Sequence, residues 1–232
     1  MNLLLTIVLL WFAWFGSMPS LKTISSTRLH INEPSGICNG GNVFYIASDD
    51  GNFFSIDGNG RVIKSIPLGM DIEDVCMVGD DIAVMDESLR LIYILDKETF
   101  KVKETHSITY SGARNFSFES LTFLPTNNEY IIITEKMPSI LFVLNNQFQV
   151  INQVTLKISN DISSATFYNG ALWILSDEDH TLFKMNPDDF SVEKKWNIPV
   201  YNPEGICFDN DGSMRIVSDD MRSMYIFPNP DK

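Results

Sequence analysis

The sequence predicts an all-β fold, a five-bladed β-propeller of four-stranded blades, closed by an N-terminal strand that completes the last blade. Three observations support this prediction. One segment recurs five times along the chain, turn-forming residues stand at matching places in the copies, and no helical period of comparable length follows residue 20. A β-sandwich with a pseudo-repeat is the alternative architecture.

The repeat is clearest between its first and last copies, PSGICNGGNVFYIASDD from Pro34 and PEGICFDNDGSMRIVSDD from Pro203. Three further copies begin at Ile72, Phe118 and Ile162. The second residue of each copy recurs at intervals of 38, 46, 44 and 41 residues, and this slot holds Ser35, Glu73, Glu119, Ser163 and Glu204. A repeat of about 40–45 residues with four strands has the size of a propeller blade.

Each copy reads as a short strand, a turn and three further strands. Asn169-Gly170 and Asp211-Gly212 supply the positive φ that tight hairpin turns require. The second strands are predicted at residues 43–48, 82–86, 130–135, 172–177 and 214–219. The last copy has only three strands, so residues 27–31 (TRLHI) are predicted to supply its outer strand and to close the ring.

The N-terminus is almost continuously apolar over residues 3–15, and no charge precedes Lys22. Because this run is shorter than the ~20 residues of a typical membrane-spanning helix, residues 1–20 are predicted to be a signal peptide or an N-terminal membrane anchor. Residues 24–230 then form a single propeller domain in the cell envelope, periplasmic or otherwise extracytoplasmic. A buried first strand or helix is the alternative for the apolar run.

The three cysteines, Cys38, Cys76 and Cys207, occupy the same slot of the repeat, on the first strand of their copies. An odd number of cysteines is unusual in an exported chain that forms disulfides. Their shared place on an inner strand predicts small buried thiols rather than metal ligands or nucleophiles.

The chain is acidic, with 17 Lys and Arg against 30 Asp and Glu, a formal charge of −13. Such a chain repels nucleic acid, so no nucleic-acid partner is expected, and its charge favours cations. Residues 1–20 carry no charge, so the excess belongs to the folded part.

Many of these acids are predicted to meet at one mouth of the central channel, where the first strand of each blade begins and the second ends. The first ring is the repeat slot described above. The second ring closes the second strands and contains Asp49, Asp86, Glu135, Asp177 and Asp219. Turn formation is the alternative role for the Asp residues of the second ring.

Carboxylates that converge on one mouth repel each other unless a cation lies among them. Oxygen ligands from several loops suit Ca²⁺, which accepts six to eight oxygens in loose geometry. The sequence therefore predicts a divalent cation, calcium, as cofactor. The predicted metal ligands are Glu73, Glu119, Glu204, Asp86, Glu135, Asp177 and Asp219.

Basic residues occur in the same loops: Arg90, Arg114, Lys136, Arg222 and His180. They either neutralise the carboxylates or hold a phosphate or carboxylate substrate against a bridging metal. The sequence contains no G-x-S-x-G elbow, no H-E-x-x-H and no C-x-x-C. No catalytic residue is therefore predicted, and whether the protein is an enzyme stays open.

The blade starts FESL (from Phe118), PEGI (from Pro203) and DIED (from Asp71) resemble those of the SdiA-regulated (YjiK/CarP-like) family of bacterial envelope proteins. The strand closers MDE, TEK, LSDE and VSD, which contain Asp86, Glu135, Asp177 and Asp219, are similar too. The likeness runs from about Ile31 to Pro228. It implies a β-propeller behind an N-terminal membrane anchor, and one branch of the family is linked to calcium response and described as phytase-like. This chain departs from the family in lacking basic residues before the apolar run.

Three functions follow as hypotheses. The leading one is an exported or membrane-anchored propeller, a monomer, that binds a divalent cation at an acidic mouth in a calcium-linked envelope role. The second is a phytase-like, metal-dependent phosphoester or ester hydrolase that binds a small phosphorylated ligand. The third is a scaffold without metal that binds an envelope protein. Fold alone does not choose among them, because propellers serve unrelated functions.

Overall fold

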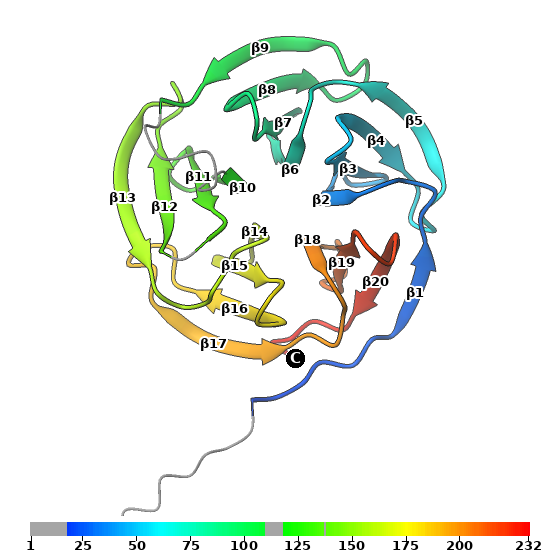
Figure 1. The fold of residues 1–232 in the computed structure, drawn as a ribbon, viewed down its shortest axis with the longest axis vertical. Coiled ribbons are helices and arrows are strands. Elements are labelled where there is room, and N and C mark those ends of the chain that lie inside the picture. The colour runs from blue at the N-terminus through cyan, green and yellow to red at the C-terminus, as the bar shows by residue number, and fades with distance from the viewer. Residues whose placement is uncertain (1–17, 110–117, 137) are drawn as a thin grey trace, which may run out of the picture.

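The structure, a computed structural model, describes residues 18–109, 118–136 and 138–232. These residues form twenty β-strands and no helix, arranged as five four-stranded antiparallel sheets around a central axis (Figure 1). The predicted five-bladed propeller is confirmed.

Each of the first four blades is continuous in the chain. The first contains β2 (Pro34–Asn39), β3 (Phe44–Ser48), β4 (Asn52–Ile56) and β5 (Val62–Pro67). The second contains β6 (Ile72–Val78), β7 (Asp81–Asp86), β8 (Leu91–Asp96) and β9 (Val102–Ser107). The third contains β10 (Phe118–Leu124), β11 (Glu129–Thr134), β12 (Ser139–Leu144) and β13 (Val150–Leu156). The fourth contains β14 (Ser164–Tyr168), β15 (Ala171–Ser176), β16 (Thr181–Met185) and β17 (Val192–Asn197).

The fifth blade is built from both ends of the described chain: β18 (Pro203–Phe208), β19 (Met214–Ser218), β20 (Ser223–Phe227) and β1 (Ser25–Arg28). Strand β1 pairs antiparallel with β20, from Ser25 opposite Ile226 to Arg28 opposite Ser223. The closing strand is therefore confirmed, but its predicted position at residues 27–31 was wrong by a few residues.

The closing strand ends early because Leu29 and Ile31 are drawn into the core. Their side chains are only 1% and 2% exposed, in the apolar cluster between the fifth and first blades that also contains Ile37 and Val217. Leu29 and Ile31 alternate with polar residues as in a strand. Their side chains are nevertheless buried between two blades, and their backbone does not extend the outer strand.

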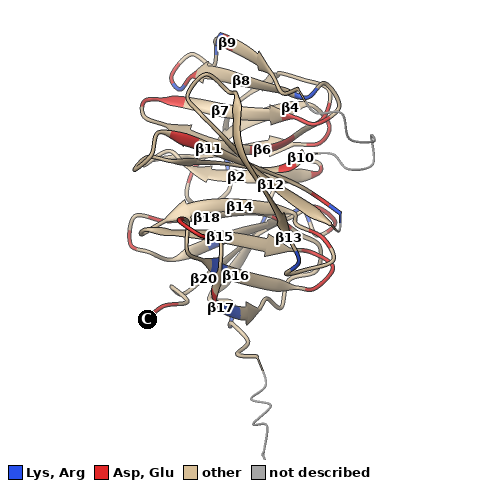
Figure 2. Ribbon diagram, turned by 90° about the vertical axis from the view of Figure 1, so that its left-hand side faces the viewer, with Lys and Arg blue, Asp and Glu red and all other residues tan. Residues whose placement is uncertain are grey.

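Burial decreases from the axis outward. The first three strands of a blade pack against the neighbouring blades, whereas the outer strands β9 and β17 are mostly exposed. In the side view, acidic residues lie mainly where strands turn at the two edges of the disc (Figure 2). The charge therefore gathers at the channel mouths and loops rather than in the sheets.

Residues 1–17 lie outside the described part, so the predicted signal peptide or anchor over residues 1–20 and the domain bounds stay predictions. Where the chain is described, it contains no helix that is long and apolar enough to cross a bilayer.

The channel is closed in its interior by a layer of mostly small residues. In the blades that start with β2, β6, β10 and β18, the pairing with the second strand shifts register at the repeat slot. The residue that directly follows the repeat slot in each of the five inner strands belongs to the layer. This layer contains Gly36, Asp74, Ser120, Ser164 and Gly205. A Cβ atom on Gly36 would lie only 2.6 Å from the Cα atom of Asp74, and one on Gly205 only 2.6 Å from the carbonyl oxygen of Ser35.

Asp74 joins three blades within this layer. Its carboxylate accepts hydrogen bonds from Val75 N (2.8 Å), Leu121 N (2.9 Å) and Ser164 Oγ (3.2 Å), and the side chain is buried. Burial raises the pKa of Asp74 to about 8, although these hydrogen bonds act in the opposite direction. The channel thus consists of two separate cavities, one on each side of Asp74.

Candidate functional site

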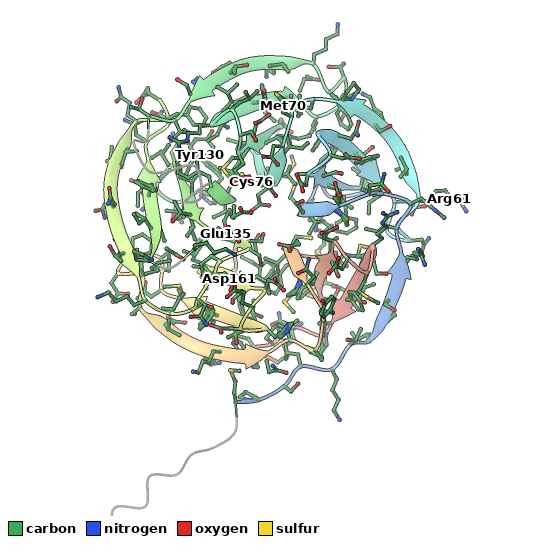
Figure 3. The ribbon with its side chains drawn as sticks, viewed as in Figure 1. Arg61, Met70, Cys76, Tyr130, Glu135 and Asp161 are labelled. Atoms are coloured by element: carbon green, nitrogen blue, oxygen red, sulfur yellow. The ribbon has the colours of Figure 1, made fainter. Side chains whose placement is uncertain are left out.

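One mouth of the channel is a cavity of about 200 Å³ lined by eight carboxylates and two serines. Its lining residues are Ser35, Asp49, Glu73, Glu119, Glu135, Asp161, Ser163, Asp177, Glu204 and Asp219. We call this cavity the acidic mouth. Figure 3, viewed down the axis, shows Glu135 and Asp161 beside the channel. Among the described residues, the lining contains no Lys, Arg or His.

All five residues of the repeat slot line the acidic mouth, because they stand at the start of the innermost strands. Four residues of the second ring join them from the ends of second strands: Asp49, Glu135, Asp177 and Asp219. The structure therefore brings together six of the seven predicted metal ligands. Whether they bind a metal stays a prediction.

Asp86 is the predicted ligand that does not line the acidic mouth. It is fully buried, and its two carboxylate oxygens accept hydrogen bonds from Met70 N and Leu89 N, each at 2.9 Å. Asp86 therefore stabilises the turn that follows β7, which is the alternative role that Asp residues commonly have at such positions.

Sequence reasoning missed two acids, Asp71 and Asp161. Asp161 lines the acidic mouth, is 2% exposed, and accepts hydrogen bonds from Ser176 Oγ (2.6 Å) and Asp177 N (2.9 Å). Both acids stand one residue before a repeat copy, at Ile72 and Ile162. The signal was thus present in the sequence, but it lay just outside the aligned segment.

The carboxylates come closest together between the first and second blades. Ligand oxygens of Asp49, Asp71 and Glu73 all lie within 4.8 Å of one another, and no other group of three or more acids, histidines or cysteines in the described chain meets this condition. Asp49 shares a hydrogen bond with Asp71, which also accepts one from Ser88 Oγ. This arrangement offers a cation three oxygen ligands from two blades.

The acidic mouth retains protons more readily than ordinary carboxylates do. Burial, and then the charges of neighbouring acids, raises the pKa of Glu73 and Glu119 well above their usual value and that of Glu204 to about 8. The hydrogen bond with Asp71, together with burial, raises the pKa of Asp49 to about 7. A cation in the cavity would lower these pKa values, because it favours the ionised form of the carboxyl groups.

The predicted anion-binding residues flank the acidic mouth instead of lining it. Lys136 forms ion pairs with Glu135 and, at 3.4 Å, with Glu178. Arg90, His180 and Arg222 each occupy a left-handed backbone position in the turn after a second strand. Arg114 lies outside the described residues.

The positive charges of these residues act on the mouth from its edge. Burial raises the pKa of Asp177 and Asp219, and His180 opposes the shift at Asp177 while Arg222 opposes it at Asp219. Lys136, His180 and Arg222 thus each lie beside an acid at the rim, and whether they neutralise these acids or hold a substrate stays a prediction.

Comparison with known protein families decides the relationship. The profile of the SdiA-regulated family matches residues 38–227, from within β2 to the end of β20. The chain belongs to the SdiA-regulated family. This match confirms the family assignment that the blade starts and strand closers indicate.

Among solved structures, this SdiA-regulated protein is similar to the glutaminyl cyclase of Myxococcus xanthus, with a TM-score of 0.75 and 13% sequence identity over 90% of this chain and 95% of that one. It is also similar to a chain of a mitotic checkpoint complex, with a TM-score of 0.52 and 12% identity over 84% of this chain and 61% of that one. No protein of curated function matches the sequence. At these identities the likeness concerns the fold alone.

The donor set of this SdiA-regulated protein fits a hard cation. The acidic mouth presents only carboxylate and hydroxyl oxygens, which are the ligands that Ca²⁺ prefers.

The raised pKa values predict that the metal-free protein loses stability with increasing pH. A carboxyl group whose pKa is higher in the folded state than in the unfolded state binds more protons when folded, so the free energy of unfolding falls as pH rises through that window. Because the pKa of Glu204 is about 8, this group alone accounts for a loss of about 3 kcal/mol between pH 5 and pH 8. Asp49, with a pKa of about 7 but greater exposure to solvent, adds less.

This loss corresponds to a decrease of about 6–12 °C in Tm for a chain of this size. It can be measured by thermal unfolding in the presence of a chelator. Glu204→Gln removes one of the titrating groups, so its Tm should depend less on pH. A Tm of the unsubstituted protein that rises between pH 5 and pH 8 would contradict the electrostatic description of the mouth.

Proposed function

We propose that this member of the SdiA-regulated family binds a divalent cation, calcium, at the acidic mouth. The observation that carries the proposal is a cavity whose lining, as far as the structure describes the chain, contains eight carboxylates and no basic residue. Ionised carboxylates at this density repel each other, and a divalent cation replaces repulsion by attraction. Binding Ca²⁺ would therefore stabilise the folded state at neutral pH.

The best place for the ion is beside Asp49, Asp71 and Glu73, whose oxygens already converge within 4.8 Å. Glu119 and Glu204 add carboxylates from the third and fifth blades to the same cavity. Because its ligands come from several blades, a bound ion would hold these blades together.

Added Ca²⁺ is expected to raise the Tm of the chelator-treated protein at pH 8, by about 4 °C or more at a concentration one hundred times the Kd. Glu73→Gln and Glu119→Gln should each reduce this rise by at least half. Both variants should also raise the Tm without Ca²⁺, because each removes a repelling charge. Glu193→Gln on the exposed strand β17 is the matched control and should change neither value.

An unchanged melting curve in millimolar Ca²⁺ would refute the proposal. So would equal Ca²⁺ responses in Glu73→Gln, Glu119→Gln and the control, because the ion would then bind elsewhere. Calorimetric titration with Ca²⁺ and Mg²⁺ separates the two ions, since Mg²⁺ demands a stricter octahedral geometry.

We further propose that the protein acts in the cell envelope, exported or anchored through residues 1–20. The apolar run of residues 3–15 supports this proposal. Fractionation of cells that express the full chain tests it, and recovery of the chain in the cytosolic fraction alone would refute it.

A metal-dependent phosphoester hydrolase is the second candidate, supported by the positions of Lys136, His180 and Arg222 at the rim. In this function the metal would supply a polarised phosphate and an activated water, and these side chains would hold the phosphate oxygens. A panel of phosphomonoesters with Ca²⁺ tests it, and no turnover across the panel would leave cation binding as the function. A protein that neither binds Ca²⁺ nor turns over a substrate would favour a scaffold for an envelope partner.

A further inference from the structure

The opposite mouth of the channel holds a second cavity of about 450 Å³, on the other side of the Asp74 layer. At its deep end the cavity is lined by one residue of each inner strand, three places after the repeat slot. This ring contains Cys38, Cys76, Thr122, Thr166 and Cys207. All three cysteines are free and buried, as their shared slot predicts. The ring thus presents three thiols and two hydroxyls to the axis.

Apolar and aromatic side chains form part of the wall nearer to solvent, beside the polar Asn39, Asp209 and Asn210. Met77, Phe123, Phe167 and Phe208 follow the ring residues on their strands and line the cavity with Tyr168. The rings of Tyr168 and Phe208 are stacked, with centroids 4.2 Å apart and an interplanar angle of 8°. Flat apolar surfaces of this kind bind flat apolar groups.

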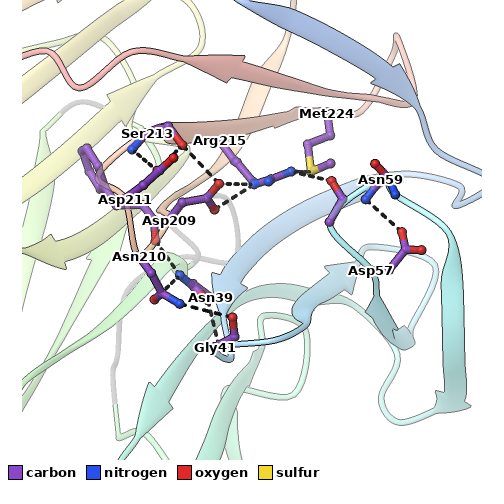
Figure 4. Close-up of polar contacts among 12 residues, drawn as sticks. Asn39, Gly41, Asp57, Asn59, Asp209, Asn210, Asp211, Ser213, Arg215 and Met224 are labelled. Atoms are coloured by element: carbon purple, nitrogen blue, oxygen red, sulfur yellow. Dashed lines mark hydrogen bonds and ion pairs between the residues drawn. The ribbon is translucent and has the colours of Figure 1, made fainter.

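The rim between the fifth and first blades is held in place by hydrogen bonds (Figure 4). Asn39 Nδ2 donates to Phe208 O at 2.9 Å and to Asn210 Oδ1 at 3.2 Å, and Asn210 Nδ2 donates to Gly41 O at 3.3 Å. These contacts keep the opening in shape in the absence of a ligand. A largely pre-formed cavity is typical of small-molecule sites.

The second cavity carries no net charge, in contrast to the acidic mouth. Burial raises the pKa of Cys38, Cys76 and Cys207, so the thiols stay protonated at neutral pH. Asp209, the one carboxylate in the lining, is paired with Arg215 at 2.8 Å. The three sulfur atoms do not form a group within 4.8 Å among the described residues, so their spacing does not suit one metal ion.

We propose that this second cavity binds a small uncharged molecule with a flat apolar body and a hydrogen-bond acceptor at one end. The body would lie between the aromatic walls, and the acceptor would face the ring of thiols and hydroxyls. The volume of about 450 Å³ lies within the range of small-molecule sites. The site is independent of cation binding, because the Asp74 layer separates the two cavities.

Three probes of nearly the same shape test the charge preference: 2-naphthamide, which is neutral, 2-naphthoate, an anion, and 2-naphthamidine, a cation. Ligand-observed NMR titration of the full-length protein is expected to give a Kd for 2-naphthamide at least tenfold lower than for either charged probe. Equal affinities for all three, or tighter binding of a charged probe, would overturn the proposal.

Two substitutions test the location. Thr166→Leu fills the deep end of the cavity, and Phe167→Ala removes a wall, so each should weaken 2-naphthamide binding at least tenfold in a protein that keeps its circular dichroism spectrum. Thr155→Leu on the exposed strand β13 makes the same chemical change away from the cavity and should leave the Kd unchanged. Unchanged binding in both cavity variants would place the probe elsewhere and refute the site.

The acidic mouth supplies a further control. Glu119→Gln and saturating Ca²⁺ should leave the Kd of 2-naphthamide within twofold of its original value. A larger change would show that the cavities are coupled, contrary to the separation by Asp74. Ca²⁺ binding and 2-naphthamide binding are measured in separate titrations, so failure of one proposal can be distinguished from failure of the other.

Discussion

Asp74→Ala is expected to lower the free energy of unfolding by about 3–5 kcal/mol. The substitution removes the acceptor of Val75 N, Leu121 N and Ser164 Oγ, which lie in three different blades. Buried donors without an acceptor each cost about 1–3 kcal/mol. The layer that holds the inner strands together would thus lose its central contact.

Urea unfolding at pH 7, followed by tryptophan fluorescence, measures this effect. Asp74→Asn retains the shape and one oxygen acceptor, so its loss should be smaller than that of Asp74→Ala. Asp188→Ala removes an exposed carboxylate from a turn and should change stability by less than about 0.5 kcal/mol. A midpoint for Asp74→Ala within error of the Asp188→Ala midpoint would show that Asp74 does not hold the blades together.

Arg215→Met is expected to cost a similar amount, about 3–5 kcal/mol. Arg215 is 7% exposed, and its Nε donates to both oxygens of Asp209, at 2.8 and 3.0 Å. Its Nη1 donates to Gly58 O in the first blade at 3.0 Å, and its guanidinium lies 4.2 Å from the centre of the Phe44 ring. The substitution leaves Asp209 with an uncompensated charge and weakens the contact between the fifth and first blades.

A double-mutant cycle separates the two losses. If the unpaired carboxylate is the main cost, Arg215→Met combined with Asp209→Asn should recover at least 1 kcal/mol relative to Arg215→Met alone. Lys97→Met breaks an exposed ion pair with Asp80 and should cost less than about 1 kcal/mol. An Arg215→Met protein as stable as the Lys97→Met protein would contradict this account of ring closure.

The fold was predictable because the same residue types recur at equivalent positions of each repeat, and these positions identify the strands and turns of a blade. The strands of the sequence prediction recur within a residue or two, and the hairpin glycines Gly170 and Gly212 have the positive φ expected of them. The exception is the closing strand. There, Leu29 and Ile31 have the alternating pattern of a strand, but they are buried between two blades and lie beyond the end of the closing strand.

The candidate site was predictable to the extent that it follows the same slots. Glu73, Glu119 and Glu204 line the acidic mouth because they start inner strands. Asp86 shares the slot of Asp177, yet it turns inward to accept two backbone N–H groups. The direction in which a carboxylate points at a turn depends on which backbone N–H groups nearby lack an acceptor. The position of the residue in the repeat does not reveal this.

By itself, the sequence determined the number of blades, the residues that start the inner strands and the family, because these depend on a local pattern that repeats along the chain. Only the tertiary structure decided which acids share a cavity, that Asp71 joins Asp49 and Glu73, and that Asp74 divides the channel in two. The physical reason is that these groups belong to different blades. Their separations are set by the packing of five sheets around one axis, where the buried carboxylate of Asp74 occupies the space that Gly36 leaves open.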